Sequence, residues 1–217
     1  MTGTRDADDT DTMTSSLISS RAAPAKATEL HAKASAGFAA KLAETEALLR
    51  SAAAGFQPLT QASSLGAEDV VITHIINRLR LDIPVFVLET GALHTETLAL
   101  LERTQAHSRA PVKVYRPEQE SVIWFIRNEG QDAMYKSIQL RKACCNIRKM
   151  EPLARALAGQ KAWITGLRQE QSAARAEVPL HDESEVATKA LHKFNPLAKW
   201  TWGDVWHYIA EHQVDYN

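Results

Sequence analysis

Short apolar segments alternate with segments of helical periodicity along this chain, and that alternation limits the possible folds more than any other feature. Ile83–Leu88 is a short, continuous apolar run, which is typical of a strand buried on both faces of a parallel sheet. Similar strand-like segments are Leu59–Ala62, Val112–Tyr115 and Ala162–Thr165. With helical segments between them, these strands predict an α/β fold with a doubly wound, mostly parallel sheet. Such a sheet binds its ligand beyond the carboxyl ends of the strands.

Apolar residues at helical spacing predict the helices. Thr28–Ala54 is rich in Ala, Leu, Glu and Lys and is expected to form one helix, with Phe38, Leu42 and Leu49 on one face. Further apolar faces are formed by Ile72, Ile75, Ile76 and Leu79, by Ile147, Met150, Leu153, Ala154 and Leu157, and by Trp202, Val205, Trp206 and Ile209.

Other residues mark helix ends, core positions and loops. Pro152 predicts a kink or a fresh helix start, and Thr201 is expected to cap the last helix together with Asp204. The apolar residues Trp124, Phe125 and Ile126 are expected in the core, as are the tryptophans of the last helix. The polar segment 179–190 is expected to be a mobile loop.

The first predicted strand ends in a loop that suits an anion. The loop residues are Ser63, Ser64, Leu65, Gly66, Ala67, Glu68 and Asp69, and a helix follows them. Backbone N–H groups and the positive end of a helix dipole point into a loop of this kind, and the serines add hydroxyl donors. A plain strand-to-helix turn with a serine cap would have the same residues, so the loop alone does not decide. The GxxxxGK[ST] pattern of the common P-loop is absent.

Two other strand ends carry residues of interest. The strand Ile83–Leu88 leads into Glu89, Thr90 and Gly91, which should line the same crevice as the serine loop. The strand Ala162–Thr165 leads into a segment with two arginines, Arg168 and Arg175, which can form forked hydrogen bonds to phosphate oxygens. Paired arginines are usually a solvated face, but a position after a strand end favours anion binding.

Cys144 and Cys145 are the two cysteines of the chain, and they stand among four cationic side chains. Cationic neighbours lower the pKa of a thiol and favour the thiolate, which is both a nucleophile and a metal ligand. Adjacent cysteines rarely bond to each other, because the peptide between them would be strained. A pair of small buried apolar residues is the plain alternative. Zinc or an iron–sulfur cluster would need about four protein ligands, and the sequence holds no second cysteine pair.

Composition narrows the classes of function. A net charge of -1 gives no electrostatic case for binding nucleic acid or a membrane surface, and no apolar run approaches the ~20 residues of a membrane span. Two cysteines cannot form a disulfide framework, which favours a reducing, cytoplasmic location. Residues 1–27 are polar and rich in Thr, Ser and Asp, so we expect a disordered tail followed by one folded domain at 28–217.

Five motifs in one order resemble the sulfonucleotide reductases. They are Ser63–Asp69, Leu88–Gly91, Cys144-Cys145 with Arg148-Lys149, Gly166-Leu167-Arg168 with Gln171-Ser172 and Arg175, and Trp202–Trp206. The resemblance extends from about Gly55 to the end of the sequence. The tandem cysteines are similar to those of the assimilatory adenosine 5'-phosphosulfate (APS) reductase branch. The fold that the resemblance implies is that of the adenine nucleotide α-hydrolase group.

The resemblance implies a thioredoxin-dependent reductase of sulfate assimilation. In that family a cysteine near the C-terminus attacks the sulfur of APS, which releases AMP and leaves an S-sulfocysteine, and thioredoxin or glutaredoxin then frees sulfite. The resemblance also implies a [4Fe–4S] cluster on Cys144, Cys145 and a later CxxC, with Lys149 linking the cluster to the substrate. The implied substrate-binding residues are Ser63, Ser64, Leu65, Gly66, Ala67, Glu68, Asp69, Leu88, Thr90, Gly91, Arg168, Gln171 and Arg175.

Two departures from the family pattern matter. The usual Leu-Asp-Thr-Gly contains Glu89 here, which is one methylene longer. The printed sequence also stops at Asn217, before the family's CxxC and catalytic cysteine, so we expect a chain truncated at its C-terminus and inactive by itself. The alternatives are a non-catalytic form that binds APS or AMP, a reductase of the 3'-phosphorylated substrate, and an ATP-cleaving relative in the same fold group. The sequence leaves the oligomeric state open, a homo-oligomer included.

Overall fold

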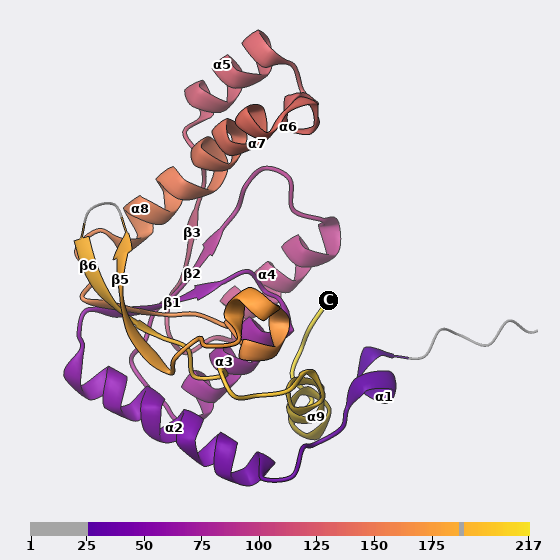
Figure 1. Ribbon diagram of the computed structural model, residues 1–217, viewed down its shortest axis with the longest axis vertical. Helices are drawn as coiled ribbons and strands as arrows, with labels where there is room; N and C mark the ends of the chain where they lie inside the picture. The colour runs from indigo at the N-terminus through magenta and orange to yellow at the C-terminus, as the bar shows by residue number, and fades with distance from the viewer. Residues whose placement is uncertain (1–25, 187–188) are drawn as a thin grey trace, which may run out of the picture.

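The computed structural model describes residues 26–186 and 189–217, and within these a six-stranded sheet runs through the centre of the molecule (Figure 1). The strand order is β3-β2-β1-β4-β6-β5, and every pair is parallel except β5 with β6. The strands are β1 (Leu59–Ser63), β2 (Val85–Leu88), β3 (Val112–Tyr115), β4 (Ala162–Ile164), β5 (His181–Val186) and β6 (Lys189–Phe194). The predicted α/β class with a mostly parallel sheet is therefore confirmed.

Helices cover both faces of the sheet. The longer ones are α2 (Phe38–Gly55), α3 (Ala67–Arg78), α4 (Thr95–His107), α5 (Gln119–Glu129) and α9 (Trp202–His212). The shorter ones are α1 (Ala27–His31), α6 (Ala133–Lys136), α7 (Ile138–Cys145), the π-helical turn η1 (Asn146–Met150), α8 (Glu151–Leu157), and the 3₁₀ turns η2 (Gln169–Gln171) and η3 (Ala173–Arg175). In the part that the structure describes, no helix combines the length and apolar character needed to cross a membrane.

Neighbouring side chains of β2 enter two separate cores. Val87 of β2 packs in the large core formed with α2, α3, α4 and α9, whereas Phe86 faces a smaller cluster with Leu157 of α8. This alternation is what a strand buried on both faces requires. Helices α5, α6 and α7 extend away from the sheet as an arm, shown at the top of Figure 1. Only Phe125, Ala133 and Cys144 are buried there as a cluster, among the described residues.

The predicted helix Thr28–Ala54 is wrong as a single element. The chain forms α1 and α2 with an irregular segment at 32–37 between them, and Gly37 adopts a left-handed conformation, φ +87°, at the start of α2. The break follows from tertiary contacts: the Lys33 backbone N–H donates to the Gly203 carbonyl, and Ser35 bonds to Asp204. Residues 1–25 of the expected disordered tail lie outside the described residues.

The polar segment 179–190 is not a loop, because most of it forms the antiparallel hairpin of β5 and β6. Its register runs from His181 opposite Phe194 to Val186 opposite Lys189. The sequence of β5 is highly charged, as is common for a strand at the edge of a sheet, and this composition concealed the strand. Residues 187–188 at its tip lie outside the described residues.

Two tryptophans expected in the core are instead exposed. Trp124 on α5 is 63% exposed because α5 belongs to the projecting arm, and Trp202 on the first turn of α9 is 39% exposed. Phe125, Trp206 and Val205 are buried, as expected. Pro152 lies in the first turn of α8, directly after the π-helical turn, which confirms the predicted helix start.

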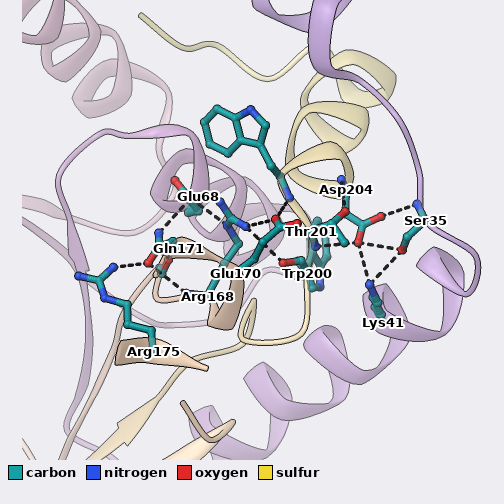
Figure 2. A network of polar contacts seen from close by, with 12 residues as sticks. Ser35, Lys41, Glu68, Arg168, Glu170, Gln171, Arg175, Trp200, Thr201 and Asp204 are labelled. Atoms are coloured by element: carbon teal, nitrogen blue, oxygen red, sulfur yellow. Dashed lines mark hydrogen bonds and ion pairs between the residues drawn. The ribbon is translucent and has the colours of Figure 1, made fainter. Parts of the chain in front are cut away.

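Asp204 joins the N-terminal segment to α9. Its buried carboxylate accepts hydrogen bonds from the backbone N–H groups of Ser35 (2.7 Å) and Thr201 (2.9 Å) and from Lys41 Nζ (2.9 Å) (Figure 2). Thr201 Oγ1 accepts from the Asp204 N–H, which completes the predicted capping box. Burial alone would raise the pKa of Asp204, but these donors outweigh burial and hold its pKa well below the usual value.

We expect Asp204→Asn to lower the free energy of unfolding by about 3 kcal/mol at neutral pH, since it breaks a buried ion pair. The contribution of a carboxyl with a depressed folded pKa is fully present above its unfolded pKa, about 3.9, and is lost as the pH falls toward the folded pKa. Urea unfolding at pH 7 and pH 3 should show the gap between variant and wild type narrowing in acid. Glu102→Gln, at an exposed position of α4, is the control. An equal gap at both pH values would contradict this assignment.

Candidate functional site

A cavity of about 1090 Å³ lies at the carboxyl ends of β1, β2 and β4 and extends to α7 and η1. It is where a doubly wound sheet places its ligand. Twelve of the residues predicted for the site line it: Ser63, Ser64, Glu68, Asp69, Leu88, Thr90, Gly91, Cys144, Cys145, Lys149, Gln171 and Arg175. The structure therefore brings together residues from four separate segments of the chain, while their roles stay predictions.

Four predicted residues do not line this cavity: Leu65, Gly66, Ala67 and Arg168. Leu65 is fully buried in the large core and adopts a left-handed backbone conformation, φ +64°, so it anchors the loop from behind. Gly66 is the N-cap of α3 and has φ −70°, a conformation open to any residue. Arg168 is also buried, and its contacts are described below.

The loop between β1 and α3 satisfies many of its own polar groups. The N–H and the hydroxyl of Ser64 both donate to Asp69 Oδ2, each at 2.7 Å. The Leu65 N–H donates to Ser63 Oγ at 3.1 Å, and the Gly66 N–H donates to Ser64 Oγ at 3.3 Å. The backbone amides expected to be free for an anion are thus partly used to hold the loop itself.

Asp69 forms the floor of the cavity next to Gly166. Burial raises the pKa of Asp69, while the donors of Ser64 and the Gly166 backbone act against that rise. A Cβ atom added at Gly166 would lie 2.4 Å from Asp69 Oδ1 and 2.9 Å from Glu68 Cβ. The close packing of the β4 end on the first turn of α3 therefore requires glycine at this position.

A chain of hydrogen bonds connects three residues that line the cavity, Glu68, Gln171 and Arg175, with the buried Arg168 (Figure 2). Arg168 Nε donates to Glu68 Oε1 at 2.9 Å, and Gln171 Nε2 donates to the same oxygen at 3.0 Å. Arg175 Nη1 donates to Gln171 Oε1. Arg168 Nη1 also donates to Glu170 Oε2 at 2.9 Å. Arg168 is thus occupied by carboxylates, whereas Arg175 is an exposed side chain at the cavity wall.

The turn after β2 is held from two sides. The carboxylate of Glu89 accepts from the Gly91 N–H (2.6 Å) and from Arg116 Nε (3.0 Å). Arg148 Nη1, from η1, donates to the Thr90 carbonyl at 2.6 Å. Gly91 has φ +73°, and a Cβ there would lie 3.1 Å from Arg148 Nη1. The turn therefore fits closely beneath the helix that carries the cysteines.

Both cysteines are free thiols, with Cys144 buried and Cys145 exposed. They end α7 immediately before the π-helical turn, and Arg141, Arg148 and Lys149 line the cavity beside them. Within residues 26–186 and 189–217, no group of three or more His, Cys, Asp or Glu side chains is arranged to hold a metal ion. The thiols suit a [4Fe–4S] cluster chemically, but the described chain supplies too few ligands to complete one.

Several lining residues were absent from the predicted site: Asp132, Tyr135, Arg141, Arg148, Trp163 and Thr165. Arg141 and Arg148 could have been found, because they lie four residues before and three after Cys145 on the same helical face. Asp132 and Tyr135 come from the arm, where no sequence pattern indicates how the arm folds back on the sheet.

Comparisons with known proteins agree with this geometry. The protein-family model named phosphoadenosine phosphosulfate reductase domain matches residues 58–217 of this chain. Adenosine 5'-phosphosulfate reductase of Allochromatium vinosum is 49% identical over 156 residues, which is 72% of this chain and 60% of the relative. The enzyme of the same name from Burkholderia cepacia is 42% identical over 180 residues, 83% of this chain and 71% of the relative.

A solved structure is also similar. The phosphoadenylyl-sulfate (PAPS) reductase of Candida auris, in a phosphate complex, has a TM-score of 0.67 and 26% sequence identity, and the match covers 80% of this chain and 81% of that one. The chain spans 60% of the length of the Allochromatium relative.

We expect Gly166→Ala to lower the free energy of unfolding by roughly 2 kcal/mol, because the added methyl group must displace Asp69 or Glu68 from a close-packed floor. Gly55→Ala is a matched control, since a Cβ at Gly55 meets nothing within 4 Å. Thermal and urea unfolding of both variants measure the difference. A Gly166→Ala protein as stable as Gly55→Ala would show that the floor can relax.

Proposed function

Because the chain belongs to the phosphoadenosine phosphosulfate reductase domain family, we propose that it forms the nucleotide-binding part of an APS reductase of sulfate assimilation. The observation that carries this proposal is one cavity in which strand-end loops, cationic side chains and two adjacent thiols meet. The volume of about 1090 Å³ slightly exceeds the range of roughly 300–1,000 Å³ that is usual for small-molecule sites.

We assign the anionic part of APS to the cations of the cavity. Lys149 and Arg175 are exposed side chains that line it, and both can stabilise the phosphate and sulfate oxygens by charge-assisted hydrogen bonds. The adenosine part would lie along the loops after β1 and β2, near Ser63, Leu88 and Thr90. In the transition state the same cations would stabilise the negative charge that develops on departing AMP.

The chemical step that we propose is thiol attack on the sulfate sulfur. A cysteine thiolate outside this chain forms a bond to sulfur while the bond from sulfur to the bridging phosphate oxygen breaks, so AMP leaves with the electron pair. A thiolate of thioredoxin or glutaredoxin then attacks the cysteine sulfur of the S-sulfocysteine, so a mixed disulfide forms as the bond to the sulfonate group breaks and sulfite leaves. The second thiol of the reductant attacks the mixed disulfide, which frees the cysteine and leaves the reductant oxidised to its disulfide. Covalent catalysis of this kind divides a difficult reduction into two thiol steps.

A [4Fe–4S] cluster belongs to the same proposal. Cys144 and Cys145 would supply two thiolates, and the remaining ligands would come from residues outside the described chain. When bound, the cluster would add a polarisable, charged group to the wall opposite the strand ends. The residues of this chain would hold the thiols in place through the Arg148 contact with Thr90.

We expect the 217-residue chain to bind AMP and APS, and Lys149→Met and Arg175→Ala each to weaken binding about ten-fold, since each removes one hydrogen bond to a charged group. Isothermal titration calorimetry measures the affinities. Arg50→Gln, on an exposed face of α2, is the control.

Absence of binding by the folded wild-type chain would refute the proposal, and sulfite release by this chain with thioredoxin would refute the assignment of the nucleophile to another segment. Tighter binding of the 3'-phosphorylated substrate than of APS would favour the PAPS branch.

We expect a longer protein that contains this chain and two further thiols to carry about four irons and four sulfides per chain when it is purified without oxygen. Cys144→Ser and Cys145→Ser should each lower both contents, because each removes a ligand. Iron and acid-labile sulfide assays measure the contents, and Cys145 is the more accessible thiol for a labelling control. Full iron content in the double substitution would exclude these cysteines as ligands.

A further inference from the structure

We infer that Arg168 positions the anion site without contacting the anion, and that it acts through Glu68 and Gln171 on Arg175. This inference rests on the proposed function, because the anion is the phosphate of the nucleotide. Sequence alone gives the two arginines the same role, since both follow the β4 strand and both can bind phosphate oxygens. The structure separates them.

The surroundings of Arg168 leave no place for an anion. Its side chain is 4% exposed, does not line the cavity, and pairs with the carboxylates of Glu68 and Glu170. Its guanidinium also lies over the Trp202 ring, with its carbon 5.4 Å from the ring centroid. With two carboxylates around one cation, the local charge is negative, and a phosphate would be repelled unless both ion pairs broke.

The contacts of Gln171 have a direction that Arg168 fixes. Glu68 Oε1 accepts from Arg168 Nε, and this places the carboxylate where Gln171 Nε2 can donate to it at 3.0 Å. With its nitrogen turned toward Glu68, the amide presents Oε1 to Arg175 Nη1. An amide has distinct donor and acceptor ends, and the charge of Glu68 favours the orientation in which Arg175 meets the acceptor end. Two backbone contacts support the same orientation: the Arg168 N–H donates to Gln171 Oε1 at 3.3 Å, and Gln171 Nε2 donates to the Gly166 carbonyl at 3.5 Å.

Arg175 needs such a support. Its side chain is exposed, and Arg175 lies at the end of the short 3₁₀ turn η3. An exposed arginine at such a position has many side-chain conformations open to it. Holding one guanidinium nitrogen on Gln171 reduces the conformational freedom that ligand binding would otherwise have to remove. The remaining nitrogens are left to meet an anion in the cavity.

We call the series of contacts from Arg168 through Glu68 and Gln171 to Arg175 the relay. Further hydrogen bonds hold Arg168, the buried end of this relay. Glu170 Oε2 accepts from Arg168 Nη1 and from the Trp202 N–H at the start of α9 (Figure 2). The Trp200 carbonyl accepts from Arg168 Nη1 at 3.4 Å. Arg168 therefore connects the first turn of α3, the turn η2 and the start of α9 to the exposed arginine at the cavity.

A double-mutant cycle tests the inference on the 217-residue chain. Arg168→Lys should weaken AMP binding about ten-fold while leaving adenosine binding within about two-fold, because only the phosphate contact is misplaced. Arg175→Ala should have the same selectivity, and the double variant should bind AMP no more weakly than Arg175→Ala alone. Losses that add in the double variant would mean that Arg168 contacts the phosphate itself, and unchanged AMP affinity in Arg168→Lys would also overturn the inference.

Two further measurements keep the result decisive. Gln171→Met alters an exposed residue of the relay, so it should fold even if Arg168→Lys does not, and it should give the same AMP-selective loss. The order parameter of the Arg175 Nε–H group, from nitrogen relaxation, should fall in both variants without any ligand. If the wild type binds no AMP, the proposed function is refuted, but the order parameter still tests whether Arg168 acts on Arg175. An order parameter of Arg175 that is unchanged in both variants would refute that inference.

Discussion

The contact between Gly166 and Asp69 is the constraint on which the cavity depends. It joins the end of β4 to the first turn of α3, and these two segments are almost a hundred residues apart in the chain. Because no Cβ separates them, the Asp69 carboxylate can accept from both donors of Ser64 while it lies against the glycine backbone. This contact places the loop after β1 directly against the segment after β4 that contains Arg168 and Arg175. The two segments together form the floor of the cavity.

The thiol pair is positioned by a different contact on the opposite wall. Cys144 and Cys145 lie on an arm that has few buried residues of its own, so the arm needs support from the sheet. Arg148 provides it by donating to the Thr90 carbonyl over a glycine turn. A π-helical turn between the cysteines and α8 lets the helix keep this contact while Pro152 starts the next segment. The contact of Arg148 with Thr90 and the packing of α8 against Phe86 of β2 therefore both hold the thiol-bearing helix at the strand ends.

The sheet could be predicted from the sequence because its signal is local. A run such as Ile83–Leu88 is apolar on both faces, and the helices between strands have regular apolar spacing. The errors have tertiary causes. The helix expected at Thr28–Ala54 is broken by the bonds of Ser35 to Asp204, and the edge strand β5 is stabilised by backbone pairing with β6 that its charged side chains do not reveal. Trp124 is exposed because the arm that carries it leaves the core.

The site residues likewise divide into those with a local sequence signal and those whose role depends on tertiary contacts. Residue types at strand ends identified the lining, but they could not show which cations are already neutralised. Arg168 is neutralised by two carboxylates and is not free to bind a ligand. The carboxylate of Asp69 likewise accepts its hydrogen bonds from its own loop. The positive charges that line the cavity are those of Arg175 on one side and of Arg141, Arg148 and Lys149 beside the thiols on the other. Under the proposed function, the anionic end of the nucleotide would therefore lie between these cations, with its sulfur toward the paired thiols and its base over the apolar strand tips at Phe86 and Leu88.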